Sequence, residues 1–100
     1  MPKEEKVVCR TPSPGKKPTR IDRWKFDLIR RLILKALPAK GEGVVFANLF
    51  DLVKKGFKPA ELRKLGSVHW FTTVVKLELE VRGEIRRIKR SIPQRLLRVA

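Results

Sequence analysis

The clearest hydrophobic pattern in this chain lies between Gly66 and Gly83. Its apolar residues recur at the spacing of one helix face: Val68, Phe71, Val74, Val75 and Leu79. Ser67 can cap the first free N–H groups, and Gly83 can end the helix in a left-handed conformation. We therefore predict a helix over 67–82 with one face in a core. A polar face remains for contact with a partner: His69, Thr73, Lys76 and Glu80.

A second apolar band follows Ile21 and is wider than one helix face: Trp24, Leu28, Ile29, Leu32, Ile33, Leu34 and Leu37. Asp22 as N-cap and Pro38 as terminator predict a central helix here. Residues 44–46 then favour a short β-strand, and residues 46–55 a brief helix that ends at Gly56. Pro59 can start a single helical turn in the connection that follows.

The chain after Gly83 predicts a β-hairpin, with strands over 84–88 and 95–99 and a turn that contains Ser91 and Pro93. The order of elements is then helix, short strand, short helix, loop, long helix, strand, turn, strand. This order is that of a winged helix-turn-helix. The predicted fold class is therefore mainly α with a small β-hairpin: three helices, a short strand that joins the hairpin edge, and a two-stranded C-terminal wing.

Residues 1–20 lack a periodic apolar pattern and contain Pro2, Pro12, Pro14 and Pro18. Because proline breaks both helices and strands, we predict a flexible basic arm over 1–20 and a winged-helix domain over 21–100. Such an arm follows a phosphate backbone or enters a minor groove, or is a solvated tail. Its candidate contacts are Lys16, Lys17 and Arg20.

Several segments have the appearance of a known family. These are Trp70-Phe-Thr-Thr-Val-Val-Lys-Leu-Glu-Leu-Glu-Val-Arg-Gly-Glu-Ile, Pro93-Gln-Arg-Leu, Thr19-Arg-Ile-Asp and Ala36-Leu-Pro. Over roughly residues 19–98 the chain resembles a family of small bacterial proteins of unknown function. The resemblance implies a winged-helix-like fold and no established activity. The wider winged-helix class implies DNA binding as the usual role, and protein binding in many members.

The net charge of +15, from 25 Lys and Arg against 10 Asp and Glu, changes this picture most. Such an excess favours a polyanionic partner, with charge that only aids solubility as the alternative. We expect no enzyme and no cofactor, because the chain has one His, one Cys and no Tyr, and no glycine-rich phosphate loop. No apolar run approaches the roughly 20 residues that span a membrane. We expect a cytoplasmic protein, associated with the nucleoid if it binds DNA.

The candidate nucleic-acid contacts fall into three groups. The wing contributes Arg86, Arg87, Lys89 and Arg90. The long helix contributes Ser67, His69, Thr73 and Lys76, and the arm contributes Lys16, Lys17 and Arg20. Double-stranded DNA is the expected partner, with the long helix in a groove and the wing on phosphates.

Two alternatives to duplex DNA remain. Structured RNA is one, because DNA and RNA both carry a charged phosphate backbone and charge alone does not distinguish them. The other is a protein-interaction or dimerisation module in which Trp24, Phe26 and Trp70 are anchors.

Overall fold

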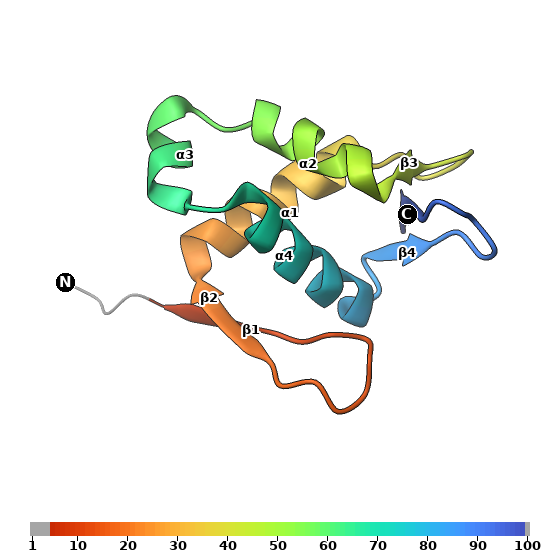
Figure 1. Ribbon diagram of the computed structural model, residues 1–100, viewed down its shortest axis with the longest axis horizontal. Helices are drawn as coiled ribbons and strands as arrows, with labels where there is room; N and C mark the ends of the chain where they lie inside the picture. The colour runs from red at the N-terminus through yellow and green to blue at the C-terminus, as the bar shows by residue number, and fades with distance from the viewer. Residues whose placement is uncertain (1–4, 100) are drawn as a thin grey trace.

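The computed structural model describes residues 5–99, which contain four helices and two small antiparallel sheets (Figure 1). The first part of the chain forms β1 (Lys6–Cys9), β2 (Thr19–Asp22), α1 (Arg23–Ala36) and β3 (Val44–Val45). The remainder forms α2 (Phe46–Lys55), α3 (Pro59–Leu65), α4 (Val68–Arg82), β4 (Ile85–Arg87) and β5 (Arg95–Arg98). Residues 1–4 of the predicted arm and residue 100 of the predicted domain lie outside the described residues.

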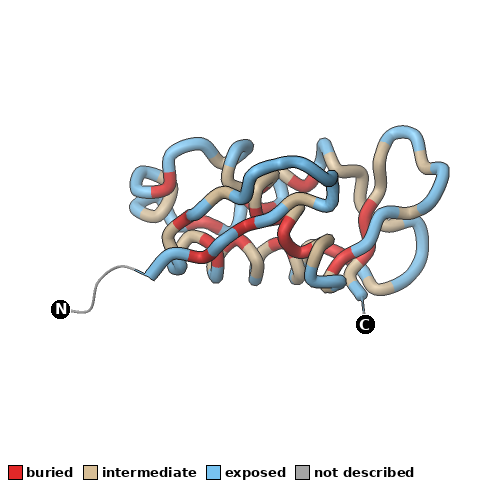
Figure 2. Tube along the Cα trace, turned by 90° about the horizontal axis from the view of Figure 1, so that it is seen from below, coloured by how far each residue is buried: buried red, intermediate tan, exposed pale blue. Residues whose placement is uncertain are grey.

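The core lies where α4 packs against α1 and α2, and the buried segments run through the middle of the molecule (Figure 2). Its central side chains have no exposed surface: Ile29, Ile33, Leu49, Val53, Val75 and Leu79. Burying each such side chain stabilises the fold by about 1.5–3 kcal/mol. The predicted core face of the long helix is therefore confirmed at Val75 and Leu79.

The ends of α4 follow from local chemistry. The Ser67 hydroxyl accepts a hydrogen bond from the Trp70 N–H at 3.1 Å, and Gly83 adopts a φ of +77°. Both predicted ends of this helix are therefore confirmed. Asp22 occupies the N-cap position of α1 but makes no capping hydrogen bond. Its carboxylate is instead paired with Lys6 and Lys25.

The C-terminal hairpin, residues 85–98, consists of β4 and β5 and the turn between them. Its sheet has the order β3-β5-β4 with all pairs antiparallel, and Val44 lies opposite Leu96. The predicted hairpin and the short strand at its edge are confirmed. The connection at Pro59, predicted as a single turn, is the seven-residue helix α3. The Glu61 carboxylate stabilises the start of α3 by accepting a hydrogen bond from the Lys58 N–H at 2.8 Å. The structure therefore has four helices among the described residues, where the sequence predicted three.

The N-terminal hairpin, residues 6–22, is the main departure from the sequence prediction. Lys6 pairs with Asp22 and Cys9 with Thr19, so the predicted arm–domain boundary at residue 21 falls inside β2. Val7, Cys9 and Ile21 belong to the core, with 5%, 2% and 3% of their surfaces exposed. The prediction that the arm lacks regular structure is therefore wrong for Lys6–Cys9 and for the first residues of β2. Flexibility of the segment between the strands stays a prediction.

Glu78 on α4 ties this hairpin to the helical core. Only 1% of its side chain is exposed, and its carboxylate accepts hydrogen bonds from the Arg10 backbone N–H at 2.8 Å and from the Arg10 guanidinium at 2.8 and 3.1 Å. Arg82 donates a further bond at 2.7 Å. Burial raises the pKa of Glu78, but these bonds outweigh burial and lower the pKa to about 2.

We predict that Glu78→Gln lowers the free energy of unfolding at pH 7 by about 2–3 kcal/mol, because an amide cannot replace the charged acceptor. A carboxyl group whose folded pKa lies below its unfolded value stabilises the fold above the unfolded pKa. That contribution disappears as the pH falls from about 4.5 to about 2. Denaturant titrations at several pH values should therefore show the wild type and the variant converging in acid.

The matched control for this prediction is Glu42→Gln, since Glu42 is an exposed loop carboxylate without an ion pair among the described residues. It should leave the free energy of unfolding unchanged. A Glu78→Gln loss of equal size at pH 7 and pH 2 would contradict a charge-dependent role.

Candidate nucleic-acid interface

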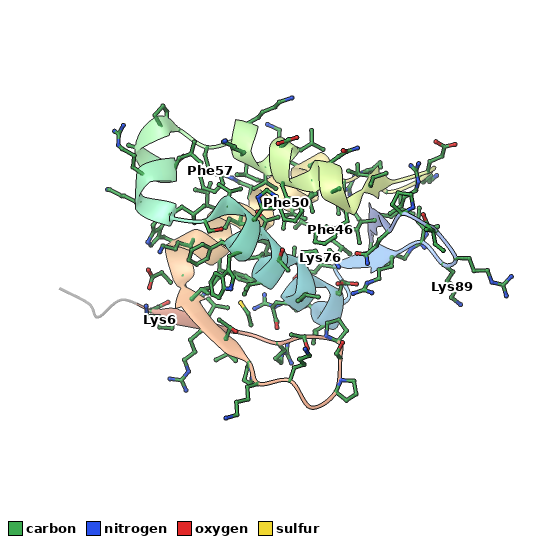
Figure 3. The ribbon with its side chains drawn as sticks, in the orientation of Figure 1. Lys6, Phe46, Phe50, Phe57, Lys76 and Lys89 are labelled. Carbon is green, nitrogen blue, oxygen red and sulfur yellow. The ribbon has the colours of Figure 1, made fainter. Side chains whose placement is uncertain are left out.

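Three cations of the C-terminal hairpin are exposed and have no ion pair within the described residues: Arg86, Lys89 and Arg90. The hairpin that carries them is closed by a hydrogen bond from the Ile88 N–H to the Arg95 carbonyl at 2.9 Å. Lys89 lies at the outer end of the hairpin, away from the helices (Figure 3). These side chains are therefore free to contact an anion.

Arg87 differs from its neighbours because it anchors the hairpin to α4. Its guanidinium donates to both carboxylate oxygens of Glu80, at 2.5 and 3.4 Å. The Glu80 side chain is 8% exposed and also pairs with Lys76 at 2.8 Å. Arg87 is therefore paired with a carboxylate of the fold, although 49% of its side chain is exposed, whereas Arg86 has no ion pair among the described residues.

Lys76 was predicted to reach a phosphate, and the structure contradicts this. Only 2% of its surface is exposed, and its ammonium lies 4.5 Å from the centre of the Phe46 ring (Figure 3). Burial lowers the pKa of Lys76, against the opposing effect of Glu80. The helical spacing of the sequence correctly placed Lys76 on the side of α4 opposite the predicted core face. That side is not open, however, because α2 and β4 cover it.

His69 lies on the same side of α4 and meets α2. Its ring stacks on Phe50 with the centroids 4.0 Å apart and the planes at 14°. Phe50 in turn contacts Phe46 at 5.0 Å between centroids. The predicted reading face of α4 is thus a seam within the fold around Lys76 and Glu80, whereas His69, at the start of this face, is exposed beside Phe50. Thr73 on this helix is half-buried.

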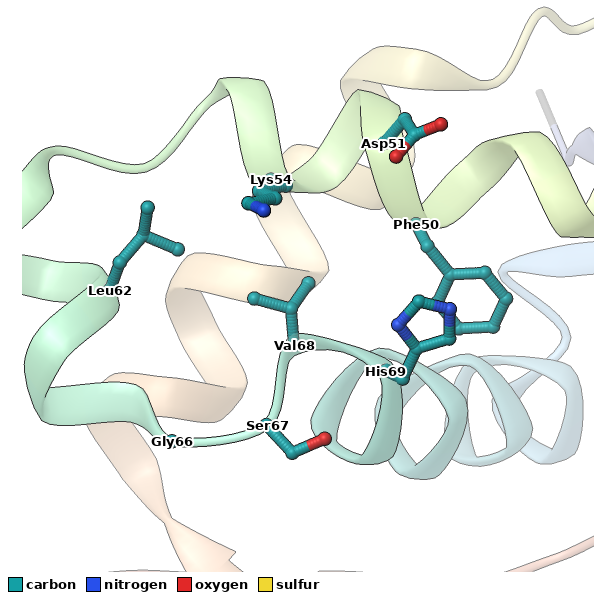
Figure 4. A pocket seen from close by; sticks show the side chains of 8 residues that line it. All are labelled: Phe50, Asp51, Lys54, Leu62, Gly66, Ser67, Val68 and His69. Atoms are coloured by element: carbon teal, nitrogen blue, oxygen red, sulfur yellow. The ribbon is translucent and has the colours of Figure 1, made fainter.

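A small cavity opens at the start of α4, between α2 and α3 (Figure 4). It is lined by Phe50, Asp51, Lys54, Leu62, Gly66, Ser67, Val68 and His69. Ser67 and His69, two predicted contacts, therefore line this cavity together with Lys54, which is not among the predicted contacts. The Ser67 hydroxyl already serves as the helix cap. The lining combines one carboxylate with one ammonium group.

The side of α4 that points away from the core and the seam is largely apolar. Trp70 is 49% exposed, and Leu77 and Val81 are half-buried. Base edges in a groove are recognised by hydrogen-bonding side chains such as Arg, Asn and Gln. The outward side of α4 does not supply these groups.

The three cations predicted on the arm are exposed. Lys16 and Lys17 lie in the loop of the N-terminal hairpin, and Arg20 lies on β2. This loop approaches the C-terminal hairpin, because one groove is lined by Pro12, Ser13 and Pro14 together with Glu80, Ile85, Arg86 and Arg87. Residues of the predicted arm and of the predicted wing therefore line the same groove.

Cys9, the one cysteine of the sequence, is buried in the core. Burial raises the pKa of the Cys9 thiol to about 11, with a further contribution from Glu78, so the reactive thiolate is suppressed. No cluster of three or more His, Cys, Asp or Glu side chains suited to a metal ion occurs in residues 5–99. Over the same residues, no helix has the length and apolarity needed to cross a membrane.

Comparison with known proteins gives one match. Residues 6–96 match a family described as "Family of unknown function (DUF6958)". The resemblance to a family of unknown function is thereby confirmed, and the match begins earlier in the chain than residue 19. A bacterial origin and a winged-helix fold for the family stay predictions. No curated protein and no solved structure matches the chain.

We predict that Glu80→Gln destabilises the fold by about 1–3 kcal/mol, because the Lys76 ammonium is left buried with a weaker partner. Adding Lys76→Met should recover much of this loss, since both buried charges are then removed. Denaturant unfolding of the single and double variants measures the effect. Asp51→Asn is the control, as Asp51 is exposed and has no ion pair in the described part of the chain.

Equal stability of Glu80→Gln and the wild type would contradict a structural role for the seam. Hydrogen exchange gives a second readout. The Ile88 N–H should exchange faster in Glu80→Gln, because Arg87 then holds the hairpin less firmly.

Proposed function

The chain belongs to this family of unknown function, and we propose that it binds double-stranded DNA through the phosphate backbone. In this proposal the C-terminal hairpin is the wing of a winged helix-turn-helix. Its cations Arg86, Lys89 and Arg90 hold phosphates, and the cations of the N-terminal hairpin loop add affinity.

The order of the elements supports this assignment of the fold. α1, β3, α2, α4, β4 and β5 follow one another as the helices and strands of a winged helix-turn-helix do. β3 pairs with β5, so the short early strand lies at the edge of the hairpin sheet. Two elements are additions to that order: the N-terminal hairpin before α1, and the short helix α3 between α2 and α4.

The observation that carries the proposal is the division of charge in the C-terminal hairpin. Arg87 is fixed to Glu80, whereas Arg86, Lys89 and Arg90 are exposed and have no ion pair among the described residues. Free cations on an anchored hairpin fit a polyanion, because each phosphate contact releases counterions. Most carboxylates near the hairpins are already used within the fold, including Asp22, Glu78, Glu80 and Glu84.

The side chains on and around α4 favour contact with the DNA phosphate backbone over contact with the bases. The seam side of α4 is occupied by Phe46, Phe50 and Arg87, and its outward side is largely apolar. Phosphate contacts position a protein on DNA but carry no sequence information. We therefore expect similar affinity for duplexes of unrelated sequence.

The test is to replace Arg86, Lys89 and Arg90 together by Gln and to measure duplex binding as a function of salt. The wild-type affinity should fall linearly with salt on logarithmic axes, with a slope of about 0.9 per phosphate contact. The triple variant should lose up to about 3 units of that slope. Fluorescence anisotropy with a random-sequence duplex provides the measurement.

The matched control replaces Lys55, Lys58 and Arg63 by Gln, which removes the same charge from α3 and from the residues just before it. In Figure 1, α3 and the C-terminal hairpin lie at opposite ends of the molecule. This variant should keep the wild-type slope. Equal slopes for the wild type and both triple variants would contradict the assignment of the hairpin.

Two further outcomes separate the alternatives. Competition between duplex DNA and duplex RNA for the protein at one salt concentration decides which of the two nucleic acids it prefers. An absence of binding to either acid would favour the protein-interaction module that the sequence also allowed.

A further inference from the structure

The surface around Trp24 differs in character from the surfaces of the two hairpins. Trp24 lies in the first turn of α1 and is 38% exposed. It lines two shallow grooves. One is formed with Ala60, Glu61 and Lys64 of α3, and the other is lined by Asp27, Leu28, Arg30, Arg31 and Glu61. Two neighbouring depressions thus share one exposed apolar side chain.

The charges around Trp24 balance, in contrast to those of the two hairpins. Asp27 and Glu61 are acidic and Arg31 and Lys64 are basic, and none of the four has an ion pair within the described residues. Two further cations border this face, and both are paired. The Arg30 guanidinium bonds to Glu84 at 2.7 Å, and the Lys25 ammonium, 5.6 Å from the centre of the Trp24 ring, pairs with Asp22 at 3.6 Å. The Trp24 patch, defined as Trp24, Asp27, Arg31, Glu61 and Lys64, therefore carries no net charge.

The absence of net charge on the Trp24 patch limits the kinds of partner that this patch can bind. Two copies of a chain with a net charge of +15 repel each other, so they can associate only where their facing surfaces balance. An acidic partner would be drawn to the unpaired cations of the hairpins instead. A second copy presents the same acidic and basic groups, as an isologous two-fold interface requires.

We propose that the Trp24 patch binds a second copy of this chain in a two-fold symmetric dimer. Trp24 of each copy enters a groove beside Trp24 of the other, and the carboxylates of one copy face the cations of its partner. Tryptophan in a desolvated pocket, ringed by polar groups, is the usual centre of a protein interface. The inference is independent of DNA binding, because it uses α1 and α3 and leaves the C-terminal hairpin free.

Charge reversal tests the proposal. Asp27→Lys makes the patch positive, and the double variant Arg31→Glu, Lys64→Glu makes it negative. Each variant alone should be monomeric in analytical ultracentrifugation, whereas an equimolar mixture should form a heterodimer. Recovery in the mixture also shows that both variants are folded. Variants that remain monomeric when mixed, or a wild type that stays monomeric at about 1 mM, would overturn the proposal.

Truncation of the tryptophan gives the second measurement. Trp24→Ala should raise the dimer dissociation constant at least about 30-fold, as expected of a central anchor. Leu52→Ala is the matched control, because Leu52 is 39% exposed and lies on α2 outside the patch. Equal dissociation constants for the wild type and Trp24→Ala would place the interface elsewhere and overturn the proposal.

Discussion

The buried carboxylate of Glu78 is the group on which the arrangement of this chain most depends. A negative charge in the interior is costly unless charged donors surround it, and here Arg10 and Arg82 supply them. Arg82 also approaches Glu84, which pairs with Arg30 on α1. One line of ion pairs therefore connects the N-terminal hairpin, α4 and α1.

The same use of carboxylates shapes the surface. Glu78 and Glu80 sit on different sides of α4, and each holds one hairpin, through Arg10 and Arg87 respectively. Two carboxylates are thereby used inside the fold, whereas Arg86, Lys89 and Arg90 on the C-terminal hairpin have no ion pair among the described residues. In our proposals the hairpins bind a polyanion, and the Trp24 patch binds a second copy of this basic chain.

Much of the helical architecture could be predicted from the sequence, because it depends on local signals. Helical spacing, Ser67 and Gly83 defined α4 to within a residue. The N-terminal hairpin could not be recognised in the same way, since its apolar alternation covers only four residues, Lys6–Cys9, before a proline-rich loop. The burial of Lys76 depends on Phe46, thirty positions earlier, and periodicity within one helix carries no information about such contacts. The exposure of Arg86, Lys89 and Arg90 was easier to predict, because exposure near a turn needs no distant partner.

The N-terminal hairpin also limits how the chain can be shortened. A fragment that starts at Ile21, where the sequence pattern alone would place the domain boundary, lacks Val7 and Cys9 from the core and Arg10 from Glu78. The carboxylate would then keep only Arg82 as a partner, and the surface of Ile21 that β1 covers would meet water. Residues 6–20 are therefore part of the smallest unit that can fold as described, although their sequence has the composition of a dispensable tail.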